Sequence, residues 1–316
     1  MVASREHFQG SLLGAAIGDA LGKCREGLTR SEAESRYEGR ITEFRKPHKK
    51  SYCSQLEAHQ HTDDTDLLLL VGESIIERQG LDPADIGDRL IQWYDAPASR
   101  KRYRGHSTSD AIGRLTKEGV ANWWMCGSDG DGCGAATRVI PVALAYVNSS
   151  RCVDFWCTIS SIITHRNVQA VDGARVVAAA LHSLCYGELP DLAQLKDITL
   201  TDAFHEKIEE AAYLLSDHVT PDEAIGFIGS ELCARNVIPL SLLIFLSNPD
   251  SFECVIDAAN ANDEKGGDTD SVACLVGAMF GLYKGVGYLP PEAVRTVENS
   301  ERARAIGEKL FEFANS

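Results

Sequence analysis

The sequence predicts an all-α fold that forms one domain over residues 1–316. Alternating β-branched residues, the pattern of strands, are almost absent from the chain. Gly10, Gly14, Gly18 and Gly22 recur every four residues, a spacing that places them on one face of a helix. Neither a linker nor a low-complexity segment divides the sequence. These observations favour a single helical domain.

The glycine spacing recurs near the other end of the chain, at Gly277, Gly281 and Gly285. Glycine costs about 1 kcal/mol relative to alanine at a helix position, so its repetition requires a packing reason. We expect the two glycine-rich helices to pass through the centre of the molecule and to pack against each other.

The remaining helices follow from apolar periodicity and from start signals such as Asp82-Pro83. Residues 23–61, 95–106 and 122–134 are polar or rich in glycine and are expected to be irregular. The helices are expected at about 66–76, 82–94, 107–118, 152–163, 168–187, 203–216, 222–234, 238–246, 252–261, 269–285 and 291–314.

The composition is that of an ordinary globular protein, with 44% apolar and 24% charged residues. A net charge of −15 argues against nucleic acid as a primary partner, because phosphate binding needs a basic face. The cationic run at 100–104 is interpreted as a solvated loop, with anion binding as the alternative.

The sequence indicates a cytoplasmic protein with no membrane span. The longest late apolar run, at 238–246, is too short to cross a bilayer. The ten cysteines form no C-x-x-C pair and are expected to be reduced thiols. We expect a monomer.

Two acidic clusters begin helices at distant points of the chain. Thr62, Asp63 and Asp64 precede a leucine-rich segment, and Asp268, Asp270 and Ser271 follow Gly266-Gly267. Each cluster has an ordinary interpretation as a capped acidic helix start, with Thr62 and Asp268 as caps. However, one acceptor suffices for a cap. Packed together, the carboxylates would repel unless cations lay between them, and oxygen ligands suit Mg²⁺ or Mn²⁺.

Two other metal sites are disfavoured. The segment 59–64 approaches the H-x-H-x-D-H zinc motif of metallo-β-lactamase-like hydrolases, but its last position is Asp64 and that fold requires β-sheets. The segment 129–132 has the start of a calcium loop without its downstream bidentate glutamate.

The chain resembles the ADP-ribosylglycohydrolase family from about residue 8 to 286. The resemblance rests on the segments 18–22 (Gly-Asp-Ala-Leu-Gly), 62–65 and 266–271, together with Glu26. It implies a compact orthogonal helical bundle with a dimetal cleft that holds two Mg²⁺ ions, or Mn²⁺. It also implies an ADP-ribosylated protein or small ADP-ribose conjugate as partner, and ADP-ribose as product.

The resemblance further implies roles for individual residues. Thr62, Asp63 and Asp64 would ligate one ion. Asp268, Asp270 and Ser271 would serve the other ion, with Asp270 bridging. Glu26 would guard or activate the reacting centre, although by itself it is typical of a surface loop. Asp110 resembles an aspartate proposed as the catalytic base in bacterial members.

The glycine-rich segment 127–138 would bind the pyrophosphate through backbone N–H groups. The family usually has Gly-Asn-Gly and Met-Arg here, whereas this chain has Thr137-Arg138 and two possible matches, 130–132 and 132–134. The register is therefore open. The substrate-binding residues implied are Ser128, Gly130, Gly132, Cys133, Gly134 and His165, of which His165 has a capping or core role as its alternative.

The function implied is hydrolysis at the anomeric carbon of the distal ribose by dimetal-assisted attack of water, which releases ADP-ribose from a mono-ADP-ribosylated group. One alternative is a catalytically silent relative that binds ADP-ribose or has a structural role. Another is a metal-dependent hydrolase of a different ribosyl metabolite. The sequence leaves the acceptor linkage open.

Overall fold

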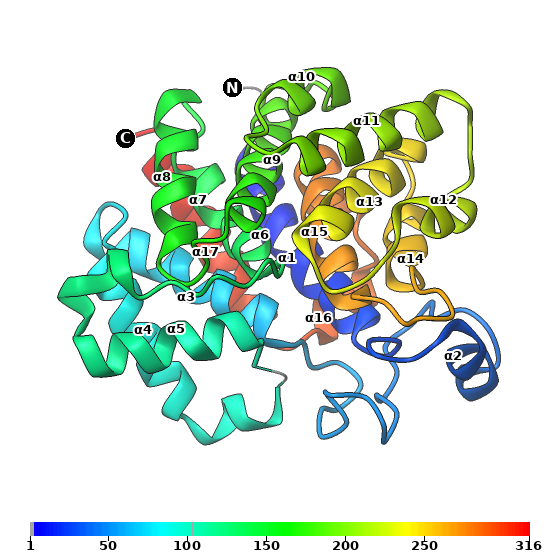
Figure 1. Ribbon diagram of the computed structural model, residues 1–316, viewed down its shortest axis with the longest axis horizontal. Coiled ribbons are helices and arrows are strands. Elements are labelled where there is room, and N and C mark those ends of the chain that lie inside the picture. The colour runs from blue at the N-terminus through cyan, green and yellow to red at the C-terminus, as the bar shows by residue number, and fades with distance from the viewer. Residues whose placement is uncertain (1–2, 103, 149) are drawn as a thin grey trace.

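The computed structural model describes residues 3–102, 104–148 and 150–316, without the side chains of 150–152. Within these residues the chain is helical and forms no sheet, which confirms the predicted fold class (Figure 1). The helices are α1 (Arg5–Gly22), α2 (Arg30–Tyr37), α3 (Asp63–Arg78), α4 (Pro83–Asp95), η1 (Pro97–Lys101), α5 (His106–Glu118), η2 (Val120–Met125), α6 (Gly134–Arg138), α7 (Ile140–Ala145), α8 (Ser150–Ile162), α9 (Val168–Cys185), α10 (Leu192–Asp197), α11 (Asp202–Ser216), α12 (Pro221–Ile228), α13 (Ala234–Ser247), α14 (Glu253–Ala259), α15 (Thr269–Lys284), η3 (Val286–Tyr288), α16 (Pro291–Thr296) and α17 (Ser300–Ala314).

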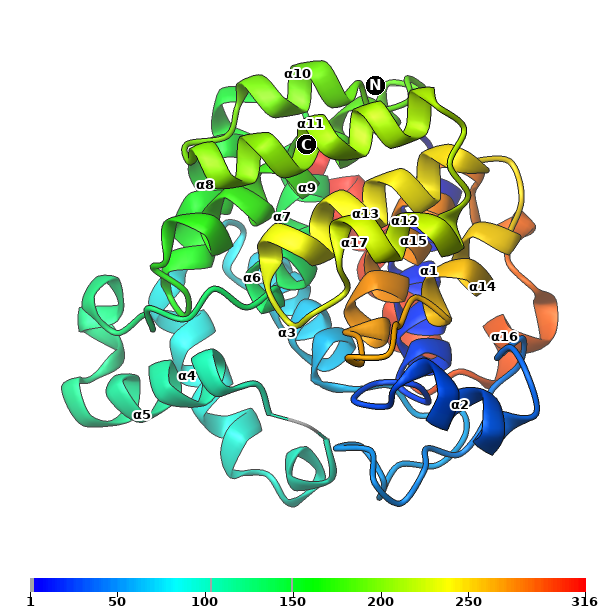
Figure 2. The ribbon, with the colours of Figure 1, turned by 45° about the vertical axis from the view of Figure 1, so that its right-hand side comes forward.

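Helices α1 and α15 pack backbone to backbone at the centre of the molecule, as the glycine spacing predicts (Figures 1 and 2). A Cβ atom on Gly14 would lie 2.1 Å from the carbonyl oxygen of Gly277, and one on Gly22 would lie 2.1 Å from that of Thr269. The pairing shows that the helices run antiparallel. The last turn of α1, which leads to Glu26, therefore lies beside the first turn of α15.

Asp19 fixes the start of α3 against α1. Its buried carboxylate accepts hydrogen bonds from the backbone N–H of Thr62 at 2.8 Å and of Thr65 at 3.1 Å. The Thr65 hydroxyl donates to the same carboxylate at 2.6 Å. These three hydrogen bonds hold the N-terminus of α3 at the C-terminal end of α1, where the contact of Gly22 with Thr269 also places the N-terminus of α15.

Two of the expected helices are each interrupted. The helix expected over 222–234 ends at Ile228, because Gly229 adopts a φ of 85° and the chain leaves the helix until Ala234. The helix expected over 291–314 divides into α16 and α17, where Asn299 has a φ of 61°. Each break depends on one residue with a positive φ, which helical periodicity alone does not reveal.

Helices α2, α6, α7 and α10 were not expected. The longest of them, α2, lies within 23–61, where irregular structure was expected. A capping box between Thr29 and Glu32 starts it, and Ala33 is its buried residue. Its polar sequence gives little apolar periodicity, so only the capping residues signal it.

The cationic run at 100–104 is not a fully solvated loop. Arg102 is buried and forms ion pairs of 2.7 Å with Asp66 and of 2.7 Å with Glu298, while Tyr103 lies outside the described residues. Lys23 is also buried, and its ammonium donates to the carbonyl oxygens of Ala20 at 2.6 Å and of Ala58 at 2.7 Å. The hydrogen bonds and ion pairs of these two cations hold the irregular segments against the helical core.

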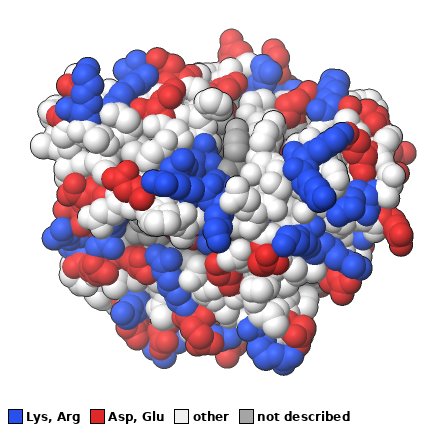
Figure 3. All heavy atoms as spheres, turned by 90° about the horizontal axis from the view of Figure 1, so that it is seen from below, with Lys and Arg blue, Asp and Glu red and all other residues white. Residues whose placement is uncertain are grey.

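In the part of the chain that the structure describes, no helix is long and apolar enough to cross a membrane. Nine cysteines there form no disulfide, and the side chain of Cys152 lies outside that part. On the face of the molecule seen in Figure 3, Lys and Arg side chains lie among Asp and Glu side chains.

Candidate active site

A pocket of about 350 Å³ lies where the N-termini of α3 and α15 meet the glycine-rich segment. Its side chains come from seven regions that are far apart in the sequence, and most of them are polar. They are Glu26, Asp63, Asp64, Gly105, His106, Ser107, Thr108, Gly130, Asp131, Gly132, Cys133, Gly134, His165, Leu232, Asp268, Asp270 and Ser271.

The two predicted acidic clusters meet in this pocket. The hydroxyl of Ser271 donates to Asp64 Oδ2 at 2.6 Å, which joins α15 directly to α3. The other oxygen of Asp64 accepts from the hydroxyl of Thr137 at 2.8 Å. Asp270 and Asp268 are buried beside this contact. The helix starts that were predicted from sequence thus form one continuous acidic surface.

Burial and mutual repulsion raise the pKa of four carboxyl groups in the pocket. Burial is the main cause that raises the pKa of Glu26, Asp63 and Asp270 well above the usual range, and neighbouring carboxylates add to it. The pKa of Asp64 rises to about 7 for the same reasons. Among the described lining residues there is neither lysine nor arginine to neutralise the negative charge of ionised carboxylates.

The donor set fits hard divalent cations. It consists of carboxylate and hydroxyl oxygens, the ligands that Mg²⁺ and Mn²⁺ prefer. Asp270 Oδ1 is buried and has no hydrogen-bond partner, which is a costly state for a carboxylate oxygen. No three His, Cys, Asp or Glu side chains of the described residues converge on a common point as they stand. Asp64 instead directs its oxygens at neighbouring hydroxyls, so ion binding would require it to turn.

Three predicted site residues do not line the pocket. Asp110 is exposed on α5. Thr62 is buried at the N-cap of α3, where its hydroxyl accepts from the backbone N–H of Asp64 at 3.4 Å. Ser128 is buried within the glycine-rich segment, and its backbone N–H donates to the carbonyl of Thr164 at 2.8 Å.

The side chain of Asp268 does not cap α15, contrary to expectation. The residue occupies the N-cap position of α15 without a capping hydrogen bond from its side chain. Its Oδ2 instead lies 2.8 Å from the thiol of Cys133. The carboxylate therefore faces the pocket.

The glycine-rich segment turns its acidic residues outward. Asp129 is exposed and forms an ion pair with Arg166 at 2.7 Å, and Asp131 is also exposed, at the pocket rim. A Cβ atom on Gly130 would lie 2.1 Å from Ser107 Oγ, so this glycine permits close packing of the segment on α5. Cys133, between Gly132 and Gly134, is the side chain that faces the acidic clusters.

A buried chain of hydrogen bonds links Arg138, Thr164 and His165. Arg138 donates to the hydroxyl of Thr164, and this hydroxyl lies 2.9 Å from His165 Nδ1. Because a guanidinium only donates, the hydroxyl accepts from Arg138, and its own hydrogen is free to point at Nδ1. Burial, together with the charge of Arg138, lowers the pKa of His165 to about 3. The imidazole is therefore neutral, and in the tautomer whose Nδ1 accepts from Thr164 it presents an Nε2–H donor beside Gly132 and Gly134.

Several lining and supporting residues were missed from the sequence. Asp19 and Arg138 belong to the motifs at 18–22 and 127–138, but their side chains do not line the pocket. Asp19 accepts a hydrogen bond from the backbone of Thr62, and Arg138 donates to Thr164. Ser107 and Thr108 come from the first turn of α5, and Leu232 comes from the break after α12. Local pattern carries no signal for these three, because only the tertiary fold brings their segments to the pocket.

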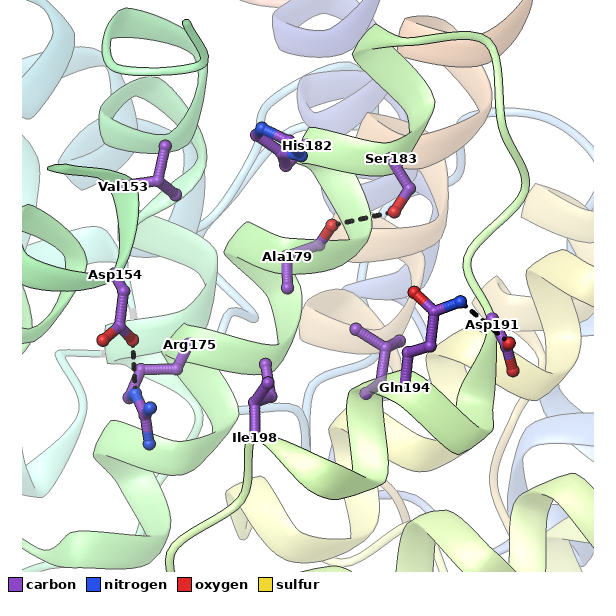
Figure 4. A pocket seen from close by; sticks show the side chains of 10 residues that line it. Val153, Asp154, Arg175, Ala179, His182, Ser183, Asp191, Gln194 and Ile198 are labelled. Atoms are coloured by element: carbon purple, nitrogen blue, oxygen red, sulfur yellow. Dashed lines mark hydrogen bonds and ion pairs between the residues drawn. The ribbon is translucent and has the colours of Figure 1, made fainter. Parts of the chain in front are cut away.

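A second pocket of about 340 Å³ lies among α8, α9 and α10 and contains none of the predicted residues (Figure 4). Its arginine, Arg175, is already paired with Asp154 at 2.5 Å. Its other lining residues are Val153, Ala179, His182, Ser183, Asp191, Gln194, Leu195 and Ile198. The acidic pocket is therefore the stronger candidate for an active site.

Comparisons with known proteins agree with the fold and the motifs. The chain superposes on a solved structure titled ADP-ribosylglycohydrolase-related protein complex with a TM-score of 0.77 and 24% identity, covering 98% of both chains. This likeness establishes the fold. The sequence profile of the ADP-ribosylglycohydrolase family matches residues 1–315. The chain belongs to this family, which is generally metal-dependent.

Several relatives match nearly the whole chain. An uncharacterised protein of Archaeoglobus fulgidus is 31% identical over 312 residues, covering 97% of this chain and 96% of that protein. ADP-ribosylhydrolase ARH3 of Bos taurus is 24% identical, covering 97% and 93%. ADP-ribosylarginine hydrolase Tri1 of Pseudomonas putida is 26% identical, covering 98% and 79%. Together with the family match, these relatives support an ADP-ribosyl hydrolase activity.

Proposed function

We propose that this protein is a Mg²⁺- or Mn²⁺-dependent hydrolase, with residues 1–316 acting as one domain. It removes ADP-ribose from a mono-ADP-ribosylated protein side chain or from a small ADP-ribose conjugate. The observation that carries the proposal is the hydrogen bond between Ser271 and Asp64, which unites two acidic helix starts in one pocket. Such a concentration of buried carboxylates has no evident structural use and is stabilised by divalent cations.

Asp63 and Asp64 on α3, with Asp268, Asp270 and Ser271 on α15, are the groups that would hold the ions. When bound, these ions polarise a water molecule and offset the charge of the carboxylates. Thr62 holds the backbone of this cluster through its cap on Asp64. The unpartnered oxygen of Asp270 supports its assignment to the metal site.

Glu26 is the proposed acceptor of a proton from the attacking water. It is buried, it lines the pocket, and Asp268 and Asp63 are close enough to raise its pKa. A carboxylate in this position also stabilises the positive charge that develops on the ribose as the glycosidic bond breaks. Asp110 is a weaker candidate because it is exposed and lies outside the pocket lining.

The glycine-rich segment and His165 are the proposed binding elements for ADP-ribose. Backbone N–H groups at 130–134 suit the oxygens of a diphosphate. His165 stays neutral over the physiological pH range, and its Nε2–H would provide a donor to the substrate. Asp129 and Asp131 are exposed, so their charges do not fill the pocket.

The test is release of ADP-ribose from arginine-linked, serine-linked and acetyl-ester substrates, measured side by side with Mg²⁺ or Mn²⁺ present. Wild-type protein should release ADP-ribose from at least one of them. Asp270→Ala should lose both bound metal and turnover, and undiminished turnover would refute the assignment. Metal and ADP-ribose binding without release from any substrate would favour the catalytically silent relative.

A further inference from the structure

The acidic pocket contains a thiol among the groups assigned to metal binding. Cys133 lines the pocket, and its Sγ lies 2.8 Å from Asp268 Oδ2 and 3.2 Å from Ser271 Oγ. Ser271 in turn donates to Asp64 at 2.6 Å. The sulfur thus belongs to a continuous chain of contacts with three candidate ligands.

A separate observation indicates that this cluster takes a cation. Asp270 is 4% exposed and lines the same pocket, and its Oδ1 has no hydrogen-bond partner. A buried carboxylate oxygen without a donor is costly, and a cation would satisfy it. Asp270 lies two residues from Asp268 and one from Ser271, the two residues that contact the thiol.

Cys133 also differs from the cysteines that fill the helical core. Cys157, Cys185 and Cys254 are fully buried in helices, where cysteine acts as a small apolar side chain. Cys133 stands between two glycines instead and meets oxygen atoms at the wall of a pocket. A purely apolar role would not place a thiol against a carboxylate and a hydroxyl.

We propose that Cys133 is a sulfur ligand for the divalent cation held by Asp268 and Ser271, so that the site accepts Zn²⁺ or Cd²⁺ as well as Mg²⁺ or Mn²⁺. This inference rests on the proposed metal site. Thiolate sulfur favours soft and borderline cations, whereas carboxylates alone favour hard ones. When the metal binds, the thiol releases its proton to solvent and the sulfur takes up the metal.

The test is a Cd²⁺ titration of wild-type protein, Cys133→Ser and Cys53→Ser, monitored by the sulfur-to-cadmium charge-transfer absorption in the ultraviolet. Cys53 is the matched control, because its Sγ lies 3.4 Å from Glu26 but does not line the pocket. Wild type and Cys53→Ser should show a saturable band that excess Mg²⁺ removes. Cys133→Ser should lack it, with Cd²⁺ affinity reduced about tenfold or more and Mg²⁺ affinity nearly unchanged.

A second measurement uses the wild-type protein alone. Saturating Mn²⁺ should slow the alkylation of Cys133 by iodoacetamide, as followed by peptide mass spectrometry, because the bound ion engages the sulfur. An equal Cd²⁺ band in wild type and Cys133→Ser, a band that Mg²⁺ does not displace, or unchanged alkylation would each overturn the inference. ADP-ribose release by Mg²⁺-loaded wild type reports on the proposed function separately, so release without a Cys133-dependent band refutes this inference alone.

Discussion

Replacing Gly14 with alanine should destabilise the protein, although alanine is the better helix former. Gly14 lies at the middle of the contact between α1 and α15, and the added Cβ would lie 2.1 Å from the carbonyl oxygen of Gly277. The obstacle is backbone, which cannot rotate aside as a side chain would. The two helices would therefore have to separate by about 1 Å to restore ordinary contact.

The expected magnitude follows from two opposing effects. Alanine gains about 1 kcal/mol over glycine in helix propensity. Overpacking of a dense core costs about 1–3 kcal/mol, and more where the obstacle is rigid. Since the clash here is with main chain on both sides, we expect a net loss of about 2 kcal/mol. The displacement of α15 should also weaken metal binding, because the first turn of this helix carries Asp270.

Gly113→Ala is the matched control. Gly113 lies within α5, it is exposed, and a Cβ atom there would have nothing within 4 Å. This variant should be as stable as wild type or more stable, by up to about 1 kcal/mol. Urea denaturation and thermal melts of both variants measure the difference. A Gly14→Ala protein as stable as Gly113→Ala would refute the backbone-to-backbone packing of α1 and α15.

Three further predictions concern the pocket. Glu26→Gln should lower kcat by about 100-fold or more, as expected for the loss of a general base, while Asp110→Asn should alter it by less than about threefold in the same assay. Because the folded-state pKa of Asp64 is about 7 and lies above its unfolded value, the stability of metal-free protein should fall as the pH rises from 5 to 8. Mg²⁺ should therefore raise the melting temperature more at pH 8 than at pH 5. Thr164→Val should remove the donor to His165 Nδ1, which ¹⁵N NMR detects as a change from a single Nε2–H tautomer to a mixture.

Each prediction has a contrary outcome. Equal losses in Glu26→Gln and Asp110→Asn would remove the basis for preferring Glu26 as base. Melting temperatures of metal-free protein that rise from pH 5 to pH 8 would contradict the raised pKa of the buried carboxyls. An unchanged His165 tautomer in Thr164→Val would show that the hydroxyl does not set it, and Ser161→Ala, which removes a nearby hydroxyl bonded only to a backbone carbonyl, serves as the control.

The sequence was most informative where one local pattern has one structural use. Glycines spaced by four predicted a close helix contact, because no other arrangement offsets their cost. The acidic runs at 62–64 and 268–271 predicted two helix starts that meet, and Ser271 and Asp64 do meet. The glycine spacing indicates how closely two backbones approach, and the acidic runs indicate where charge is concentrated.

The remaining features depend on tertiary contacts that local pattern does not encode. Lys23 and Arg102 stand in polar segments, yet carbonyl and carboxylate partners far along the chain allow their burial. The break at Gly229 depends on a single positive φ that helical periodicity does not report. Asp110 stands near the start of a predicted helix, but this pattern does not indicate which face of the helix points toward the pocket.

The antiparallel pairing of α1 with α15 also has a consequence for biosynthesis. The pocket needs Glu26 and Asp270 together, and these residues are separated by most of the chain. A ribosome-bound chain lacks α15 until late in translation, so the glycine face of α1 stays exposed until then. Contacts of such long sequence separation slow folding. Activity should therefore appear only after nearly complete synthesis, and a chaperone that shields the face of α1 should increase the yield.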